Sequence, residues 1–128
     1  MNQATPSTEL TAAAPTLDAL RRTAMFDYVL HICCIVFSLG LLSIVPLIIN
    51  YIRRPAARGT IYESHFTWQI RSCWWTLFWM IVLAVPFALL TALSLGLLSF
   101  LFALPIIWFV YRMIKGLLWL NDGKPMLV

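Results

Sequence analysis

The sequence predicts an all-α, polytopic helical membrane protein, and three observations support that prediction. The forty residues from Ser72 to Tyr111 carry no charge, and residues 28–52 carry none when the histidine among them is neutral. A helix needs about 20 apolar residues to cross a bilayer, so the first stretch has room for two crossings and the second for one. The composition agrees, since 62% of the residues are hydrophobic and only 11% are charged, against about 25% charged in soluble domains. We therefore expect three transmembrane helices.

The chain before the first span divides into a tail and a short helix. Residues 1–15 are rich in Thr, Ala, Ser and Pro, and such a composition cannot bury a core, so we expect a disordered tail. Residues 16–128 are expected to form a single membrane domain. Thr16 is a suitable N-cap for a helix, and Leu20 and Ala24 continue an apolar stripe that leads toward the first span.

The first span is predicted at about residues 28–52, and its middle is its weakest part. Gly40, Ser43 and Pro46 lie close together there, and a proline removes one backbone hydrogen bond and kinks a helix. We expect a single kinked crossing that is broken, if anywhere, between Ser38 and Pro46. A re-entrant hairpin, which returns to the side it came from, is the alternative.

An amphipathic helix at about residues 60–70 is expected to lie on the inner membrane surface and to lead directly into the second span. The second span is predicted at about residues 70–92 and the third at about 97–120. Glycine and serine favour a tight turn between them, within residues 92–98. The sequence Asn-Asp-Gly-Lys-Pro at residues 121–125 is typical of a helix stop.

A six-residue sequence occurs twice. Ser-Leu-Gly-Leu-Leu-Ser stands at residues 38–43 and again at residues 94–99. Chance is one interpretation in a chain so rich in leucine and serine. The other is a pair of related packing surfaces, because small residues let helices approach closely.

The basic residues predict the orientation in the membrane. Seven of the nine Lys and Arg residues lie in the linker after the first span or at the end of the third span. The positive-inside rule then predicts a multi-pass protein of the bacterial inner membrane, with its N-terminus outside and its C-terminus inside. The basic side would face anionic lipid headgroups. A nucleic-acid partner is not expected, because anchoring at the span ends accounts for most of these charges.

Six polar residues are candidates for functional or packing contacts. They are His31, Asn50, Glu63, His65, Gln69 and Arg71. His31 follows Asp27 by one helical turn, so we expect an ion pair or hydrogen bond between them at the outer interface. Asn50 lies deep in the first span, and we expect it to turn inward and bond to another helix. The other four are expected at the inner interface, bonded to headgroups or to a neighbouring helix end.

These residues do not predict a catalytic or metal site. No motif of a catalytic nucleophile or of a phosphate-binding loop is present. The predicted topology separates His31 from His65 by about 30 Å, so the two cannot share one metal ion or haem. The three cysteines are odd in number and lie in apolar segments, which supports neither a disulfide framework nor a zinc site. We therefore expect no catalytic residue, no metal and no cofactor.

The order of several short motifs resembles a bacterial membrane family of unknown function. The motifs are His31, Pro-Leu-Ile-Ile at residues 46–49, Glu-Ser-His-Phe at residues 63–66 with Gln69, and the Asn-Asp-Gly-Lys-Pro end. That family is related to the polytopic inner-envelope component of the chloroplast protein-import translocon. The resemblance implies a compact helical bundle without a known enzyme activity.

Together, these observations predict a small membrane protein that is not an enzyme. We expect it to act through helix packing as an accessory, assembly or scaffold subunit, in a homo-oligomer or with another membrane protein. The alternative is an oligomeric transporter or channel component, which resembles a translocon subunit. Three helices alone hardly enclose a pore, so that alternative requires self-association.

Overall fold

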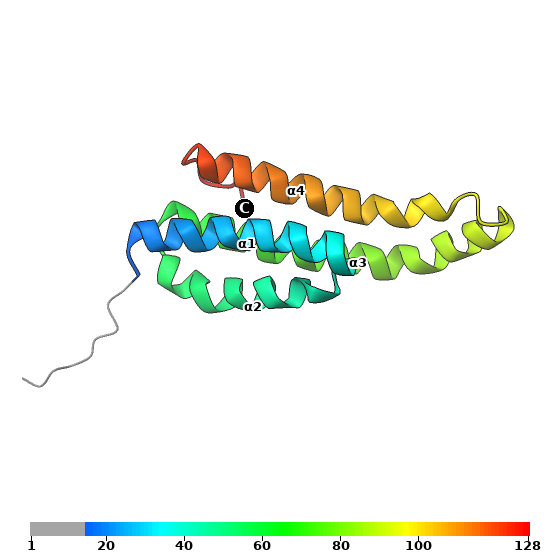
Figure 1. Cartoon of the computed structure of the whole chain (residues 1–128), viewed down its shortest axis with the longest axis horizontal. Coiled ribbons are helices and arrows are strands. Elements are labelled where there is room, and N and C mark those ends of the chain that lie inside the picture. The colour runs from blue at the N-terminus through cyan, green and yellow to red at the C-terminus, as the bar shows by residue number, and fades with distance from the viewer. Residues whose placement is uncertain (1–14) are drawn as a thin grey trace, which may run out of the picture.

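The chain forms two helical hairpins that pack side by side, as a computed structural model of residues 15–128 shows (Figure 1). The first hairpin consists of α1 (Leu17–Ser38) and α2 (Ile44–Arg53), and the second of α3 (Ile61–Leu93) and α4 (Leu104–Asn121). Short 3₁₀ segments at Leu41–Ser43, Arg54–Ala57 and Ser99–Ala103 complete the described chain. The all-α prediction is confirmed. The predicted disordered tail lies outside the described residues, apart from Pro15.

The prediction of one kinked crossing at residues 28–52 is wrong. The stretch breaks at Leu39 and Gly40, both in left-handed backbone with φ of 52° and 94°, and α2 then runs back along α1. Two left-handed residues in succession reverse a chain, whereas proline would only have kinked it. The hydroxyl of Ser38 accepts a hydrogen bond from the Leu42 amide at 3.0 Å and closes the turn. The first stretch therefore has the hairpin shape of the alternative interpretation.

The repeated hexapeptide is a turn that the chain uses twice. In the second copy, Leu95 and Gly96 have φ of 53° and 90°, and the Ser94 hydroxyl accepts from the Leu98 amide at 3.0 Å. These values match those of the first copy, and a 3₁₀ segment follows each turn. The repeat thus encodes a helix-reversing turn rather than a packing surface. The predicted turn within residues 92–98 is confirmed.

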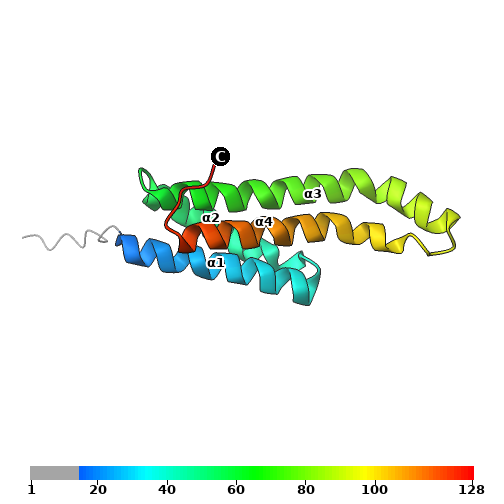
Figure 2. The same ribbon diagram turned by 90° about the horizontal axis from the view of Figure 1, so that it is seen from above.

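The separate interfacial helix predicted at residues 60–70 is not present, because α3 runs unbroken for 33 residues, or about 50 Å. Nothing in its first three turns breaks a helix, and His65, Phe66 and Gln69 there are buried against the other helices. The second hairpin consequently extends well beyond the first (Figures 1 and 2). Two segments, Ile61–Leu93 and Ser99–Asn121, are long and apolar enough to cross a membrane, rather than the three predicted.

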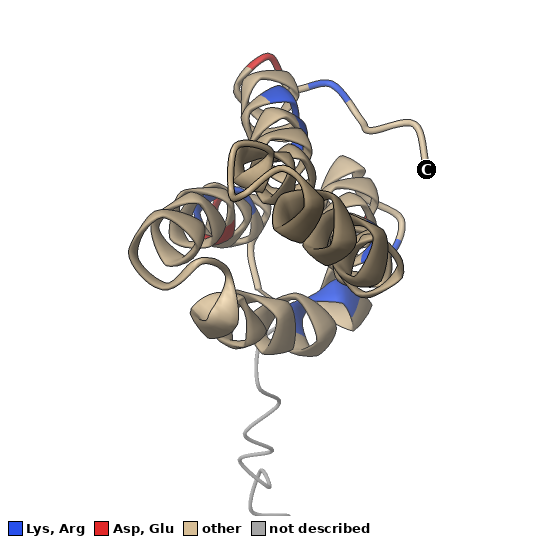
Figure 3. Cartoon of the chain, turned by 90° about the vertical axis from the view of Figure 1, so that its right-hand side faces the viewer, with Lys and Arg blue, Asp and Glu red and all other residues tan. Residues whose placement is uncertain are grey.

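All charged side chains of the described chain gather in one half of the bundle. They occupy residues 18–27 of α1, residues 53–71 between α2 and early α3, and residues 112–124 at the end of α4. Because both hairpins turn back, these segments meet at the same end, where α1 begins and α4 finishes (Figure 1). Figure 3 looks at the molecule from the opposite end and colours the charged residues. We call this the charged end, and residues 28–52 with 72–111 the apolar half. The two ends of the described chain therefore lie together at the charged end.

Candidate functional site: a buried polar core and an apolar groove

The first half of α3 packs with the other three helices around a group of polar side chains without solvent exposure. We call this group the polar core. Its members are Asp27, Tyr28, His31, Asn50, His65, Gln69 and Ser72, each with 0% of its surface exposed. Buried polar groups are costly unless hydrogen-bonded, so their partners decide what the core can do.

Asn50 of α2 ties three helices together. Its amide nitrogen lies 3.2 Å from Nε2 of His31 on α1 and 3.0 Å from Oε1 of Gln69 on α3. The Gln69 amide in turn donates to the carbonyl of Ala24 on α1 at 3.5 Å. Because the Asn50 nitrogen can only donate, Nε2 of His31 accepts and the ring proton is on Nδ1, 3.7 Å from Sγ of Cys73. The expected packing bond of Asn50 is therefore present.

His65 connects α1 to the segment after α4. Its Nε2 lies 2.8 Å from the carbonyl oxygen of Lys124, and its Nδ1 lies 3.1 Å from the hydroxyl of Tyr28. A carbonyl can only accept, so Nε2 carries the proton and Nδ1 accepts from the tyrosine. The Met126 amide also donates to the Ser64 hydroxyl at 2.9 Å. These bonds hold the chain after α4 against α3, where Asn-Asp-Gly-Lys-Pro ends the helix as predicted.

Arg112 of α4 holds α3 through a stacked and hydrogen-bonded contact that sequence reasoning missed. Its guanidinium lies 3.6 Å above the centre of the Trp68 ring, and its Nε donates to the Ser72 hydroxyl at 2.7 Å. The Trp68 indole donates back to the Arg112 carbonyl at 3.2 Å. Trp68 and Ser72 are one turn apart on a helix, so their spacing was a usable signal. From the sequence, anchoring at the span ends was the only role expected for most of the basic residues.

Asp27 and Asn50 leave buried oxygens without partners. Neither carboxylate oxygen of Asp27 nor Oδ1 of Asn50 has a hydrogen-bond partner among the described residues. The expected bond between Asp27 and His31 is not formed, since the histidine uses its nitrogens toward α2 and α3. Burial raises the pKa of the Asp27 carboxyl to about 7, and the nearby charge of Arg53 opposes that rise. Near neutral pH this carboxyl is therefore easily protonated.

The structure brings four of the six candidate residues into one core and leaves two outside. His31 and His65 belong to the same core, so the prediction that a bilayer separates them is wrong. The reversal of α1 into α2 removes the crossing on which that separation depended. Glu63 instead accepts from the Gly59 amide at 3.1 Å, and Arg71 is exposed. Within residues 15–128 no three His, Cys, Asp or Glu side chains lie together as metal ligands would.

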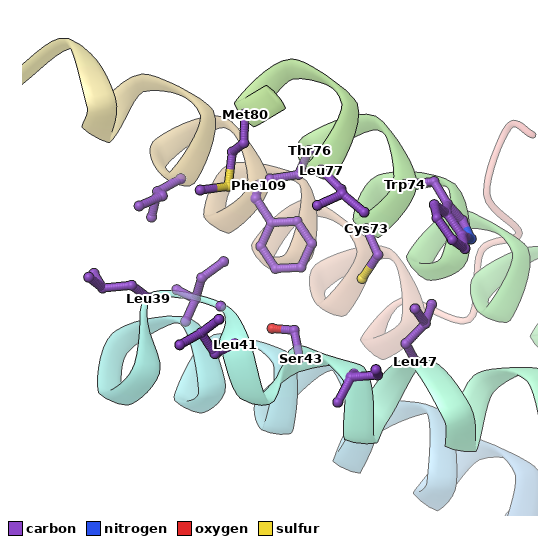
Figure 4. Close-up of a pocket in the computed structure, with 14 residues that line it drawn as sticks. Leu39, Leu41, Ser43, Leu47, Cys73, Trp74, Thr76, Leu77, Met80 and Phe109 are labelled. Atoms are coloured by element: carbon purple, nitrogen blue, oxygen red, sulfur yellow. The ribbon is translucent and has the colours of Figure 1, made fainter. Parts of the chain in front are cut away.

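An apolar groove of about 360 Å³ lies next to the polar core, on the side of the apolar half. One wall comes from the first hairpin around its turn, and the other from α3 and α4, as Figure 4 shows. Its lining residues are Ile35, Leu39, Gly40, Leu41, Ser43, Ile44, Leu47, Cys73, Trp74, Thr76, Leu77, Met80, Ile106 and Phe109. The groove therefore offers a place for an apolar group and very little for a polar one.

No protein-family model, curated protein or solved structure matches the chain. The resemblance to the translocon-related family consequently stays a prediction from short motifs. Three of the residues that carry it, His31, His65 and Gln69, lie in the polar core, and Pro46 is buried at the start of α2. These four residues of the motifs are therefore buried inside the bundle.

Proposed function

We propose that the chain is a non-catalytic protein of the bacterial inner membrane that acts through helix packing, as an accessory, assembly or scaffold subunit. The observation that carries this proposal is the distribution of polar and apolar groups. Most hydrogen bonds of the polar core join one helix of the bundle to another. The outer surface of the apolar half consists of exposed aliphatic and aromatic side chains.

We infer a membrane placement in which α3 and α4 cross and the α1–α2 hairpin enters from the same side without crossing. Residues 72–93 of α3 span about 33 Å at 1.5 Å per residue, close to the roughly 30 Å of a bilayer core. The charged end then carries every Lys and Arg of the described chain. By the positive-inside rule, that end and both ends of the described chain face the cytoplasm.

The apolar groove supports a contact with a neighbouring membrane helix. It opens where the chain carries no charge, so in this placement its surroundings are hydrocarbon or another apolar helix. Packing between membrane helices depends on close fit, and a groove can accept the side chains of a partner helix. Trp74, Leu77 and Met80 form one wall of the groove on α3. We propose that it takes large apolar side chains of a partner's helix.

The alternative of a channel component has less support. A pore requires polar side chains along a path through the lipid, whereas the side chains of the polar core bond mainly to other segments of the same bundle.

Photo-crosslinking tests the proposed packing. A photoreactive amino acid is placed in the groove at Leu41 or Leu77, and at Val82 as a control that is exposed on α3 outside the groove. The proposal predicts one discrete protein adduct from the groove positions and a weaker one from Val82. Sedimentation in mild detergent should show a mass above one chain. A monomer that gives only lipid adducts at Leu41 and Leu77 would overturn it.

A further inference from the structure

The outer face of the first hairpin carries a second cleft of different chemistry, with a volume of about 470 Å³. It is lined by Arg22, Thr23 and Phe26 of α1, and by Ile49, Ile52 and Arg53 of α2. The cleft thus joins two guanidinium groups to an apolar floor at the boundary between the charged end and the apolar half. We call it the arginine cleft.

Both arginines of the arginine cleft are available to an anion. Within residues 15–128 the one ion pair joins Lys124 to Asp122, so neither Arg22 nor Arg53 is paired. Thr23 uses its hydroxyl proton on the Ala19 carbonyl at 2.9 Å, which leaves the two guanidiniums as donors. Guanidinium is the preferred side chain for phosphate oxygens, because it donates two parallel hydrogen bonds.

Two carboxyl groups of α1 bear on this cleft: Asp18 lies one helical turn before Arg22, and Asp27 lies in the field of Arg53. The Asp27 side chain is fully buried on α1, and the charge of Arg53 acts on it. Since burial raises the pKa of this carboxyl to about 7, it competes only weakly with an incoming anion near neutral pH.

The apolar part of the cleft distinguishes a lipid from a soluble anion. Phe26 and Ile52 are 58% and 67% exposed, although they lie beside the arginines. One helical turn nearer to the hairpin turn, Val29 and Ile48 are exposed as well. An apolar track therefore leads from the two guanidiniums toward the apolar half, as acyl chains would run. Inorganic phosphate can bind only the two guanidiniums. A phospholipid can also bury its acyl chains against the apolar side chains.

We propose that the arginine cleft binds an anionic phospholipid, with its phosphate between Arg22 and Arg53 and its acyl chains along Phe26 and Ile52. The inference rests on the membrane placement of the proposed function and is independent of the packing partner. A zwitterionic lipid carries an ammonium group that the two arginines repel, so an anionic headgroup is favoured. The site would hold the first hairpin at the cytoplasmic surface.

Native mass spectrometry of the purified full chain in neutral detergent tests this proposal. Phosphatidylglycerol and phosphatidylcholine of equal chain length are titrated against the protein, with inorganic phosphate as a third probe. The expected result is about tenfold tighter binding of phosphatidylglycerol than of phosphatidylcholine, and no competition from inorganic phosphate. The double variant Arg22→Gln/Arg53→Gln should lose that preference.

A matched double variant, Arg58→Gln/Arg71→Gln, removes two exposed charges of the same end outside the cleft and should keep the preference. Equal losses in both double variants would overturn the proposal in favour of diffuse attraction, as would effective competition by inorganic phosphate. Should the cleft double variant fail to fold, Arg53→Gln alone gives the same comparison against Arg58→Gln. Crosslinking at Leu77 in the cleft variant reports the packing function separately.

Discussion

Asn50 of α2 donates a hydrogen bond to Nε2 of His31 on α1, with 3.2 Å between the two nitrogens. The same amide also reaches Gln69 of α3 at 3.0 Å. A single side chain thus fixes how the first hairpin closes and how that hairpin meets the second. It also keeps the His31 ring neutral, because Nε2 must accept.

Replacing Asn50 should destabilise the bundle strongly. Asn50→Leu leaves a buried acceptor on His31 and another on Gln69 without their donor, and we expect a loss of about 2 kcal/mol. Unfolding in detergent micelles, followed by circular dichroism, measures it. Asn121→Leu is the matched control, because Asn121 is exposed at the end of α4. Equal stability of the two variants would contradict the role given to Asn50.

Gly116 permits the close contact of α4 with α1. A Cβ at this position would overlap the ring of Tyr28, which is fully buried and cannot move aside without losing its bond to His65. Gly116→Ala should therefore cost about 1–3 kcal/mol. Tyr28→Ala makes room for the methyl group, so the double variant should be more stable than the sum of the single losses predicts. Strict additivity in this double-mutant cycle would mean that the two residues do not meet.

The two copies of the repeated turn should respond alike to substitution. Gly40 and Gly96 have φ of 94° and 90°, and an added Cβ meets no atom closer than 3.8 Å at the first and none within 4 Å at the second. Alanine at either position should cost about 1 kcal/mol through backbone strain alone. Asparagine tolerates this backbone region better and should recover part of the loss. Thermal unfolding of the four variants checks the prediction, and a cost confined to one copy would contradict it.

Asp27 should make stability depend on pH. Its pKa is about 7 in the folded chain and 3.8 when solvated, so the folded state holds a proton that the unfolded state releases. Stability should therefore fall as pH rises from about 4 to 7, and level off above 7. Asp27→Asn should remove this part of the dependence and stabilise the protein at pH 8. The check is the difference in unfolding midpoint between the two proteins at pH 5 and pH 8, and a constant difference would refute the assignment.

Local signals in the sequence predicted most of the helices. The lack of charge in residues 72–111 predicted the two long apolar helices. Thr16 caps α1 as expected, with its hydroxyl 3.2 Å from the Ala19 amide. The turn after α3 was also predicted correctly. The reversal of the chain after Ser38 was not predicted. It depends on the left-handed backbone of Leu39 and Gly40, whereas the irregularity in the sequence was assigned to a kink at Pro46. The repeated hexapeptide could have predicted this turn. The copy at residues 94–99 was predicted to turn, and the identical copy at residues 38–43 folds in the same way.

The polar core could be predicted only in part. Asn50 was expected to bond to another helix, and it does. Its partner His31 was predicted on the far side of the bilayer. That prediction followed from a first span that crosses, whereas the hairpin brings α1 and α2 side by side. The contact of the Arg112 guanidinium with Trp68 was not predicted, because it joins two helices whose relative register no local pattern reveals.

The most direct test of the two-hairpin arrangement is accessibility labelling of single cysteines in a background without Cys33, Cys34 and Cys73. The positions are Leu17 and Leu127, which are 59% and 81% exposed near the two ends of the described chain, and Leu97 in the far turn. A membrane-impermeant reagent applied from outside should label position 97 and neither end, and both ends should react once the membrane is opened. Outside labelling of position 17 with protection of position 127 would mean that the first stretch crosses the membrane, and would contradict the account.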